Sequence, residues 1–232
     1  MAAFAVGCTG TSTQKGCDAV QTYLAGLDPF LIHSSEDNRW IPTPVGTTPH
    51  ALSCLMPNGE IYPEVLNTLL FTLQFPDKPA VILNDYSGKE LEVTEQGCKI
   101  LYKTPNYWGV RLDTCGERND LIFRPMADMN LWSQQKSKWM YGPGVSVGLC
   151  KKVREVMNKN NCKDKNIMIS SGFNLEKIKF FLENDAPFDA IGTGSFVEFG
   201  KITADIIKVN NNPVVKAGRE WLYTAEENFK GE

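Results

Sequence analysis

The sequence lacks several features that mark large classes of protein. It contains no Cys-x-x-Cys pair, and its only two histidines are not at ligand spacing, so we expect no zinc site. Its longest apolar stretches, such as residues 65–75, are broken by polar residues and are too short to span a membrane. The start of the chain has no basic region of the kind a secretory leader needs. The net charge of −3 gives no electrostatic reason to expect nucleic acid or an anionic membrane surface as a partner.

The composition is otherwise that of an ordinary globular protein. Apolar residues make up 42% of the 232 residues and charged residues 22%, which suits one substantial core in a single domain. The seven cysteines are an odd number and are scattered along the chain. We therefore expect a cytoplasmic protein whose cysteines are reduced and serve mostly as small core residues.

Strand-like apolar runs alternate with helical patterns along most of the chain. The predicted strands are residues 3–8, 41–47, 80–84, 107–113, 166–170 and 188–192, and the predicted helices are residues 18–24, 64–73, 90–101, 145–160 and 175–183. This alternation predicts an α/β fold with a parallel sheet and right-handed crossovers.

The pattern further indicates a (β/α) barrel that is incomplete. Six units are too few for an eight-stranded barrel, which typically takes about 250 residues. Because the chain opens inside a predicted core strand, we expect the N-terminal part of the fold to be absent from it. We assign residues 1–200 to the barrel portion, with an irregular stretch at 115–140. Residues 201–232 are expected to form a C-terminal hairpin and tail, with strands at 203–209 and 214–216 around a turn at 210–213, packed on the barrel or on an absent domain.

Two late strands end in small and hydroxyl residues that suit a phosphate. Glycine lets the backbone approach a ligand closely, and the free N–H groups at a helix start favour an anion. In (β/α) barrels the loops after consecutive late strands commonly hold phosphate. We therefore predict phosphate binding, and a phosphorylated small molecule as the ligand, from two loops whose residues are Ser170, Ser171, Gly172, Gly192, Gly194 and Ser195.

The strand at residues 109–114 carries a charged pair on one face. Side chains alternate along a strand, so Arg111 and Asp113 point to the same side, and Val110 and Leu112 to the other. A barrel places its reactive groups near the carboxyl ends of its strands. Asp113 can accept hydrogen bonds from a sugar diol and Arg111 can bind a phosphate, although an internal salt bridge is an alternative.

His50 and the loop at residues 7–14 are further candidates for the site. His50 follows a predicted strand, which favours a functional role as much as a structural one, whereas His33 lies in a polar loop and is expected to be solvated. The hydroxyl-rich loop, which includes Thr11 and Ser12, can either bind a polar ligand or cap the next helix.

Taken together and in order, these motifs resemble the nicotinate phosphoribosyltransferases of the shorter type, which carry a Gly-Thr-x-Pro-His-Ala-Leu segment. The resemblance extends over nearly the whole chain, at residues 7–12, 46–52, 110–114, 170–174, 188–195, 204–209 and 213–216. It implies an irregular (β/α) barrel of the type II phosphoribosyltransferase kind. It also implies that nicotinate and 5-phosphoribosyl 1-pyrophosphate are joined to give nicotinate mononucleotide and pyrophosphate.

The same resemblance implies roles for single residues. His50 matches a catalytic histidine that ATP phosphorylates, and Arg111 and Asp113 match residues that hold the phosphoribosyl group. Asn84 and Asp85 stand where the family usually has an Asp at a strand end, and we expect them to bind substrate with Thr11 and Ser12. Mg²⁺ is expected on the departing pyrophosphate, and the complete protein is expected to be a homodimer.

Ser12 bears on which base is used. The related nicotinamide enzyme carries an acidic residue at this place, and a carboxylate there would repel ionised nicotinate, whereas a serine hydroxyl can donate to it. Nicotinamide or quinolinate as the base, or a phosphosugar-binding remnant without catalysis, remain the alternatives. Two departures from the family are the absent N-terminal domain, with its ring-stacking aromatic residue, and Ser171 in place of a common glycine.

Overall fold

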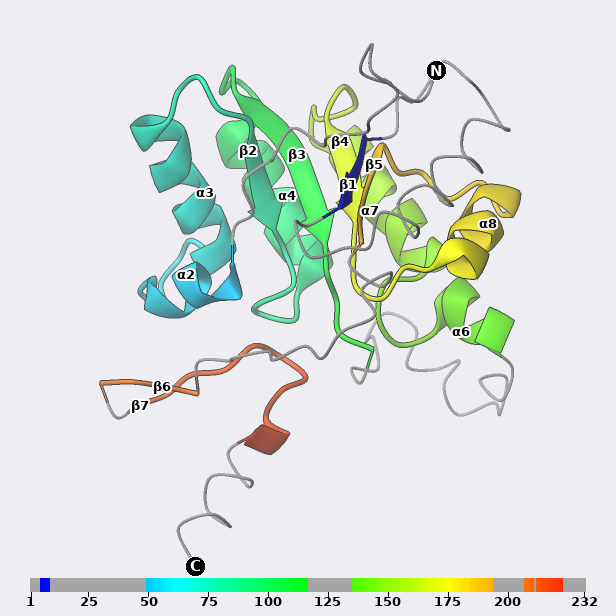
Figure 1. Cartoon of the computed structure of the whole chain (residues 1–232). Coiled ribbons are helices and arrows are strands. Elements are labelled where there is room, and N and C mark those ends of the chain that lie inside the picture. The colour runs from blue at the N-terminus through cyan, green and yellow to red at the C-terminus, as the bar shows by residue number, and fades with distance from the viewer. Residues whose placement is uncertain (1–4, 9–48, 117–134, 194–206, 211, 223–232) are drawn as a thin grey trace, which may run out of the picture.

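The computed structural model describes residues 5–8, 49–116, 135–193, 207–210 and 212–222 of the chain (Figure 1). Its strands are β1 (Ala5–Cys8), β2 (Ala80–Leu83), β3 (Tyr107–Leu112), β4 (Asn166–Ile169), β5 (Ala190–Thr193), β6 (Lys208–Val209) and β7 (Asn212–Pro213). Its helices are α2 (His50–Leu55), α3 (Pro63–Gln74), α4 (Glu90–Leu101), α6 (Gln135–Tyr141), α7 (Val147–Lys159) and α8 (Leu175–Glu183).

Five strands form one parallel sheet in the order β1-β5-β4-β3-β2. The prediction of a parallel α/β fold is therefore confirmed. The first strand in the sequence pairs with the last one of the sheet, which is the neighbour relation that strands have around a barrel. Among the described residues no pairing joins β1 to β2, so the sheet is open there and a barrel is not shown. The predicted strand 41–47 and helix 18–24 lie outside the described residues.

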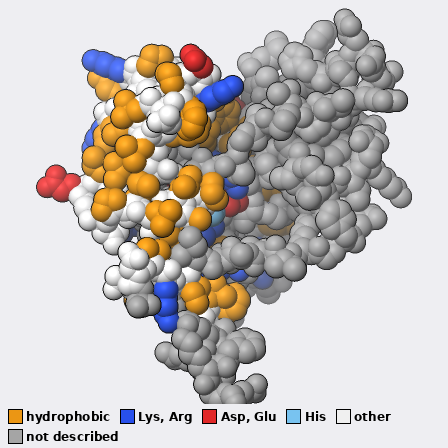
Figure 2. All heavy atoms as spheres, turned by 60° about the vertical axis from the view of Figure 1, so that its left-hand side comes forward, with side chains coloured by type: hydrophobic (Ala, Val, Ile, Leu, Met, Phe, Trp, Pro, Cys, Tyr) orange, Lys and Arg blue, Asp and Glu red, His pale blue; other side chains and the backbone are white. Residues whose placement is uncertain are grey.

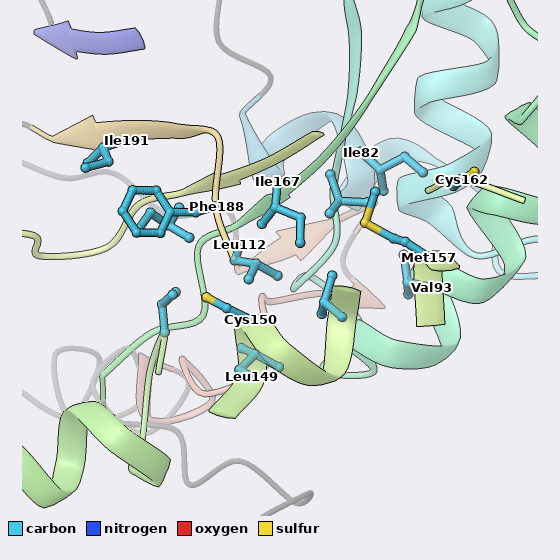
Figure 3. Close-up of a cluster of buried hydrophobic side chains, with 14 of the residues drawn as sticks. Ile82, Val93, Leu112, Leu149, Cys150, Met157, Cys162, Ile167, Phe188 and Ile191 are labelled. Atoms are coloured by element: carbon cyan, nitrogen blue, oxygen red, sulfur yellow. The ribbon is translucent and has the colours of Figure 1, made fainter. Parts of the chain in front are cut away.

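Alternation along the strands separates a helix-facing side of the sheet from an opposite side. Val110 and Leu112 have no exposed surface and pack in the core beneath α4 and α7, while Arg111 between them points the other way. Figure 1 shows α4 and α7 on one face of the sheet. Apolar side chains from the strands and these two helices interdigitate in this layer, including Ile82, Val93, Leu112, Met157 and Ile167 (Figure 3).

Glycine is required at one point of the sheet. Gly109 has a φ of +149°, and a Cβ there would collide with the backbone carbonyl of Asn166 on the neighbouring strand β4. The close approach holds β3 against β4 in the register that pairs Arg111 with Met168. This register sets which side chains meet at the carboxyl ends of the two strands.

Side chains cap the N-termini of helices α7 and α8. Helices α4 and α8 have the predicted bounds, and the Asn174 side chain caps α8 by accepting a hydrogen bond from the N–H of Lys177 (2.9 Å). Helix α7 begins at Val147 rather than at the predicted residue 145, because the hydroxyl of Ser146 caps it. Helix α3 begins one residue earlier than predicted, with Pro63 in the first helical turn, a place that suits proline.

Three expectations about irregular and hairpin segments were inaccurate. Residues 135–141 form α6 inside the stretch that we expected to be irregular, and α2 was not predicted. The hairpin is confirmed, with Val209 paired to Asn212, and its second strand lies at 212–213 rather than at the predicted 214–216. Asn210 has a φ of 50°, and asparagine tolerates this left-handed conformation, so the turn can be tighter than the predicted four residues.

One face of the molecule carries exposed apolar side chains over α2 and α3 (Figure 2). The residues concerned are Leu52, Leu55, Leu70, Leu73 and Phe75, which immediately follows α3. No helix of the described residues is both long and apolar enough to cross a membrane. The five described cysteines with placed side chains are buried, as expected of small core residues.

Candidate functional site

The polar residues at the carboxyl ends of β2, β3 and β4 lie in one cluster because of strand register. Leu83 pairs with Arg111 and Leu112 pairs with Ile169, so the residues that follow these strands share one edge of the sheet. On β3 and β4 alternation turns Asp113 and Ser170 to the side that Arg111 occupies. His50 reaches this edge from α2, and Lys216 reaches it from the segment after β7. We call the whole cluster the polar site; its residues are His50, Asp85, Arg111, Asp113, Ser170 and Lys216.

His50 donates a hydrogen bond to a fully buried carboxylate. Its Nε2 lies 2.8 Å from Oδ1 of Asp85, which follows β2, and 3.9 Å from Oδ2 of Asp113. Lys216 approaches from the other side, with its Nζ 2.5 Å from Oδ2 of Asp85. Burial by itself raises the pKa of Asp85, but the hydrogen bond from His50 and the charge of Lys216 outweigh it and lower the pKa below its ordinary value. Asp85 is therefore a carboxylate held between a hydrogen-bond donor and a cation.

Arg111, Asp113 and Ser170 form the second half of the polar site. The Nε of Arg111 donates to the hydroxyl of Ser170 (2.9 Å), and its Nη2 lies 3.2 Å from Oδ2 of Asp113. The Ser170 hydroxyl lies 2.7 Å from Oδ1 of Asp113, to which it can donate. The predicted shared face of Arg111 and Asp113 is confirmed, and the salt bridge that we kept as an alternative is present. Both side chains are partly exposed, at 22% and 18%, so a ligand can reach them.

Asn84 lies next to the polar site but faces away from it. Alternation turns its side chain to the helix side of the sheet, where its Nδ2 donates to Thr94 of α4 (3.0 Å). Thr114 has the same orientation at the end of β3, and its hydroxyl donates to the buried carboxylate of Glu90 (2.7 Å). The structure thus brings Asp85 to the predicted site and directs Asn84 to α4.

The loop after β4 contains two consecutive residues in the left-handed backbone conformation. Ser171 and Gly172 both have positive φ, at 75° and 69°, and α8 begins three residues later. The ammonium of Lys177 lies 4.1 Å from the Phe173 ring centroid and 3.4 Å from the carbonyl oxygen of Ser171. Burial lowers the pKa of this lysine to about 8. Phosphate binding by this loop stays a prediction.

The predicted glycines of the second phosphate loop are only partly described. Gly192 lies in β5, and a Cβ there would come within 3.4 Å of the Ser170 side chain, so β5 packs closely beside the polar site. Four further predicted site residues lie outside the described residues: Thr11, Ser12, Gly194 and Ser195.

Lys216 is the residue of the polar site that sequence reasoning missed. Besides its ion pair with Asp85, its Nζ donates to the main-chain carbonyl of Asp113 (3.0 Å). The neighbouring Ala217 donates its N–H to the carbonyl of Tyr86 (3.1 Å), so the segment after the hairpin is docked on the carboxyl edge of the sheet. The available signal was a single lysine that follows the apolar pair 214–215.

An open hollow of about 420 Å³ is lined by Tyr86 and Ala217, the chain neighbours of Asp85 and Lys216. Tyr62 and Lys89 also line it, with the lysine ammonium 5.7 Å from the tyrosine ring centroid. Within the part of the chain that the structure describes, no group of three or more His, Cys, Asp or Glu is placed to hold a metal ion.

The comparisons with known proteins do not show which family the chain belongs to. No family model matches the chain, and no curated protein matches it. Among solved structures it is similar to the crystal structure of nicotinate-nucleotide pyrophosphorylase from Pyrococcus furiosus, with 22% sequence identity and a TM-score of 0.46. The similarity covers 75% of this chain and 37% of that one, so the chain spans little more than a third of that protein's length. The function proposed below therefore rests on the residues of the polar site.

Proposed function

We propose that the chain carries the active-site portion of a nicotinate phosphoribosyltransferase. The reaction joins nicotinate to 5-phosphoribosyl 1-pyrophosphate, with ATP hydrolysis, and yields nicotinate mononucleotide and pyrophosphate. The observation that supports this most is the meeting of five residues that the sequence had singled out from separate segments. They are His50, Asp85, Arg111, Asp113 and Ser170.

Arg111 and Asp113 are suited to the phosphoribosyl group. The guanidinium offers several donors in a rigid plane, and it already binds a hydroxyl and a carboxylate at once, so phosphate or ribose oxygens can take over part of this pattern. Asp113 can accept hydrogen bonds from the ribose diol. Holding the ribose in this way assists displacement at the anomeric carbon mainly through positioning.

His50 is suited to accept a phosphoryl group from ATP. Its Nε2 donates to Asp85, which leaves Nδ1 as the ring nitrogen with a lone pair. Attack by Nδ1 on the γ-phosphorus would form an N–P bond and break the bond to the β-phosphate oxygen, so that ADP leaves with the electron pair. Asp85 then balances the positive charge of the phosphorylated ring. This arrangement follows the general pattern of a nucleophile oriented by a neighbouring group.

We expect Mg²⁺ to bind together with the substrate phosphates. Mg²⁺ usually keeps several waters and binds through substrate phosphates rather than through a cage made only of protein groups. An ion that arrives on the pyrophosphate would neutralise the charge that develops there. The protein's own part is to hold the ribose and the phosphates in line.

The proposal of nicotinate as the base rests on Ser12. One experiment tests it together with the alternatives, which are nicotinamide, quinolinate and a remnant without catalysis. The complete protein, with any upstream domain restored, should be incubated with phosphoribosyl pyrophosphate, Mg²⁺ and nicotinate, nicotinamide or quinolinate, with and without ATP. We expect nicotinate mononucleotide from nicotinate and faster turnover with ATP. Product from one of the other bases would replace nicotinate as the substrate. Binding of phosphoribosyl pyrophosphate without any product would favour the non-catalytic remnant.

A further inference from the structure

We propose that Lys216 is a positioning residue for His50, and that its charge keeps the His50 ring neutral while Asp85 stays ionised. This inference rests on the proposed function, because a neutral ring with a free Nδ1 is what phosphoryl transfer to His50 requires. It assigns a task to the segment after β7, which reaches the polar site through Lys216.

The geometry places Asp85 between a histidine and a lysine, with no exposed side-chain surface. A buried carboxylate needs a compensating positive charge. Lys216 supplies it at Oδ2, so Oδ1 can accept from a neutral imidazole at 2.8 Å. Without Lys216 the nearest group able to carry the compensating charge is His50 itself. The histidine would then take a second proton, at Nδ1, and lose its nucleophilic lone pair.

The acidic groups around His50 and Asp85 act against Lys216. Asp113 lies 3.9 Å from its Nε2 and is itself paired with Arg111. The carboxyl of Glu64, on α3, interacts with the charge of Asp85 and accepts two hydrogen bonds from Ser87. The carboxyl groups of Asp85 and Asp113, beside the ring, favour the imidazolium, and Lys216 is the cation in direct contact with Asp85 that opposes them.

A purely structural role of Lys216 would have different consequences. The lysine also donates to the Asp113 carbonyl at 3.0 Å, so it helps to dock the C-terminal segment on the sheet. Loss of docking alone would lower stability or loosen the site at every pH. Loss of the charge would instead change the pH at which His50 titrates, and an increase in pH would restore its function.

The test is an NMR titration of ¹⁵N-histidine in the full chain, with the His50 signals assigned through a His33→Gln variant. Lys216→Gln removes the charge but keeps a hydrogen-bond donor, Lys216→Arg keeps the charge, and Lys208→Gln is a matched control on the exposed hairpin strand β6. We expect the midpoint of the His50 titration to lie higher in K216Q than in the wild type, and to be unchanged in K216R and K208Q. An unchanged midpoint in folded K216Q would overturn the proposal.

Labelling with γ-labelled ATP supplies the second readout. K216Q should label about ten- to a hundredfold more slowly at neutral pH, a range taken from the loss of outer-shell partners of metal ligands, and should recover as the pH rises. A deficit that is the same at every pH would assign Lys216 to docking alone. If K216Q does not fold, K216R decides, because a displaced His50 midpoint in that variant would contradict the charge role. Absence of label in the wild type would remove the proposed function, while the titration would still test the effect of Lys216.

Discussion

Asp85, whose side chain has no exposed surface, accepts a 2.8 Å hydrogen bond from Nε2 of His50. The two residues are separated by 35 positions in the sequence and by the whole of α3. The contact defines which ring nitrogen of His50 is available for chemistry. It also makes Asp85 the residue on which the stability and the function of the polar site both depend.

Replacement of Asp85 should be costly and pH-dependent. Asp85→Asn leaves Lys216 without its buried partner, and removal of one member of a buried pair typically costs about 3–5 kcal/mol. Because the pKa of Asp85 is lower in the folded than in the unfolded protein, its contribution is present above the unfolded value of 3.8 and is lost as the pH falls through the folded value. Urea unfolding of both proteins between pH 7 and pH 3 should show this difference shrinking.

The exposed Asp164, which pairs with Lys165, provides the control for this measurement. Asp164→Asn should change the free energy of unfolding by less than about 1 kcal/mol, as is usual for surface ion pairs. An effect of Asp85→Asn no larger than that of Asp164→Asn would contradict the buried arrangement of Asp85.

Lys177 should make the stability of the protein rise in mildly alkaline solution. Its pKa is about 8 in the folded protein and 10.5 in the unfolded chain, so the unfolded chain binds more protons between these values and stability increases with pH there. The difference corresponds to about 3 kcal/mol. Lys177→Met should therefore be more stable than the wild type at pH 7, and this advantage should shrink towards pH 10. The same substitution at the exposed Lys151 should give a difference that does not change with pH, and an equally flat result for Lys177→Met would rule out a lowered pKa.

Substitutions of two arginines at opposite ends of the sheet should have different effects, one on ligand binding and the other on stability. Arg111 binds Ser170 and Asp113 at the carboxyl ends of the strands, whereas Arg154 of α7 binds the Lys165 carbonyl and Asp189 beside their amino ends. A lysine cannot reproduce either two-pronged contact. In calorimetry Arg111→Lys should bind phosphoribosyl pyrophosphate at least about tenfold more weakly, a loss of about 1.4 kcal/mol. Arg154→Lys should lower the melting temperature and keep the affinity. Equal affinities in the two variants would remove the phosphate role of Arg111.

Asp113→Asn tests whether the Arg111–Asp113 pair is catalytic or only structural. The amide keeps the shape and a hydrogen bond with Ser170, but it loses the charge that pairs with Arg111. Because Asp113 is partly exposed, we expect a change in stability of less than about 1 kcal/mol. We expect kcat/KM of the complete enzyme to fall by about a hundredfold or more. Normal kcat/KM in this variant would leave the pair with a structural role alone.

Alternation and strand order made much of the fold and site predictable. Period-two patterning placed Arg111 and Asp113 on one face, and the register of β3 and β4 then brings Ser170 to them. Alternation alone would also have turned Asn84 towards α4, which our grouping of Asn84 with Asp85 overlooked. Lys216 could not be placed from sequence, because its contact with Asp85 spans 131 positions and depends on how the segment after the hairpin docks. The sequence could not show whether the sheet closes into a barrel, because closure depends on long-range pairing of strands.

The most direct test of the proposed function is transfer of label from γ-labelled ATP to His50. The protein, completed with its upstream domain if one exists, should be incubated with the nucleotide, denatured, and held at acid and at alkaline pH. Phosphohistidine is stable in alkali and labile in acid, so we expect label on the wild type that survives base and disappears in acid, and none on His50→Ala. Label that persists in acid, or that remains in His50→Ala, would contradict the proposal that His50 accepts the phosphoryl group.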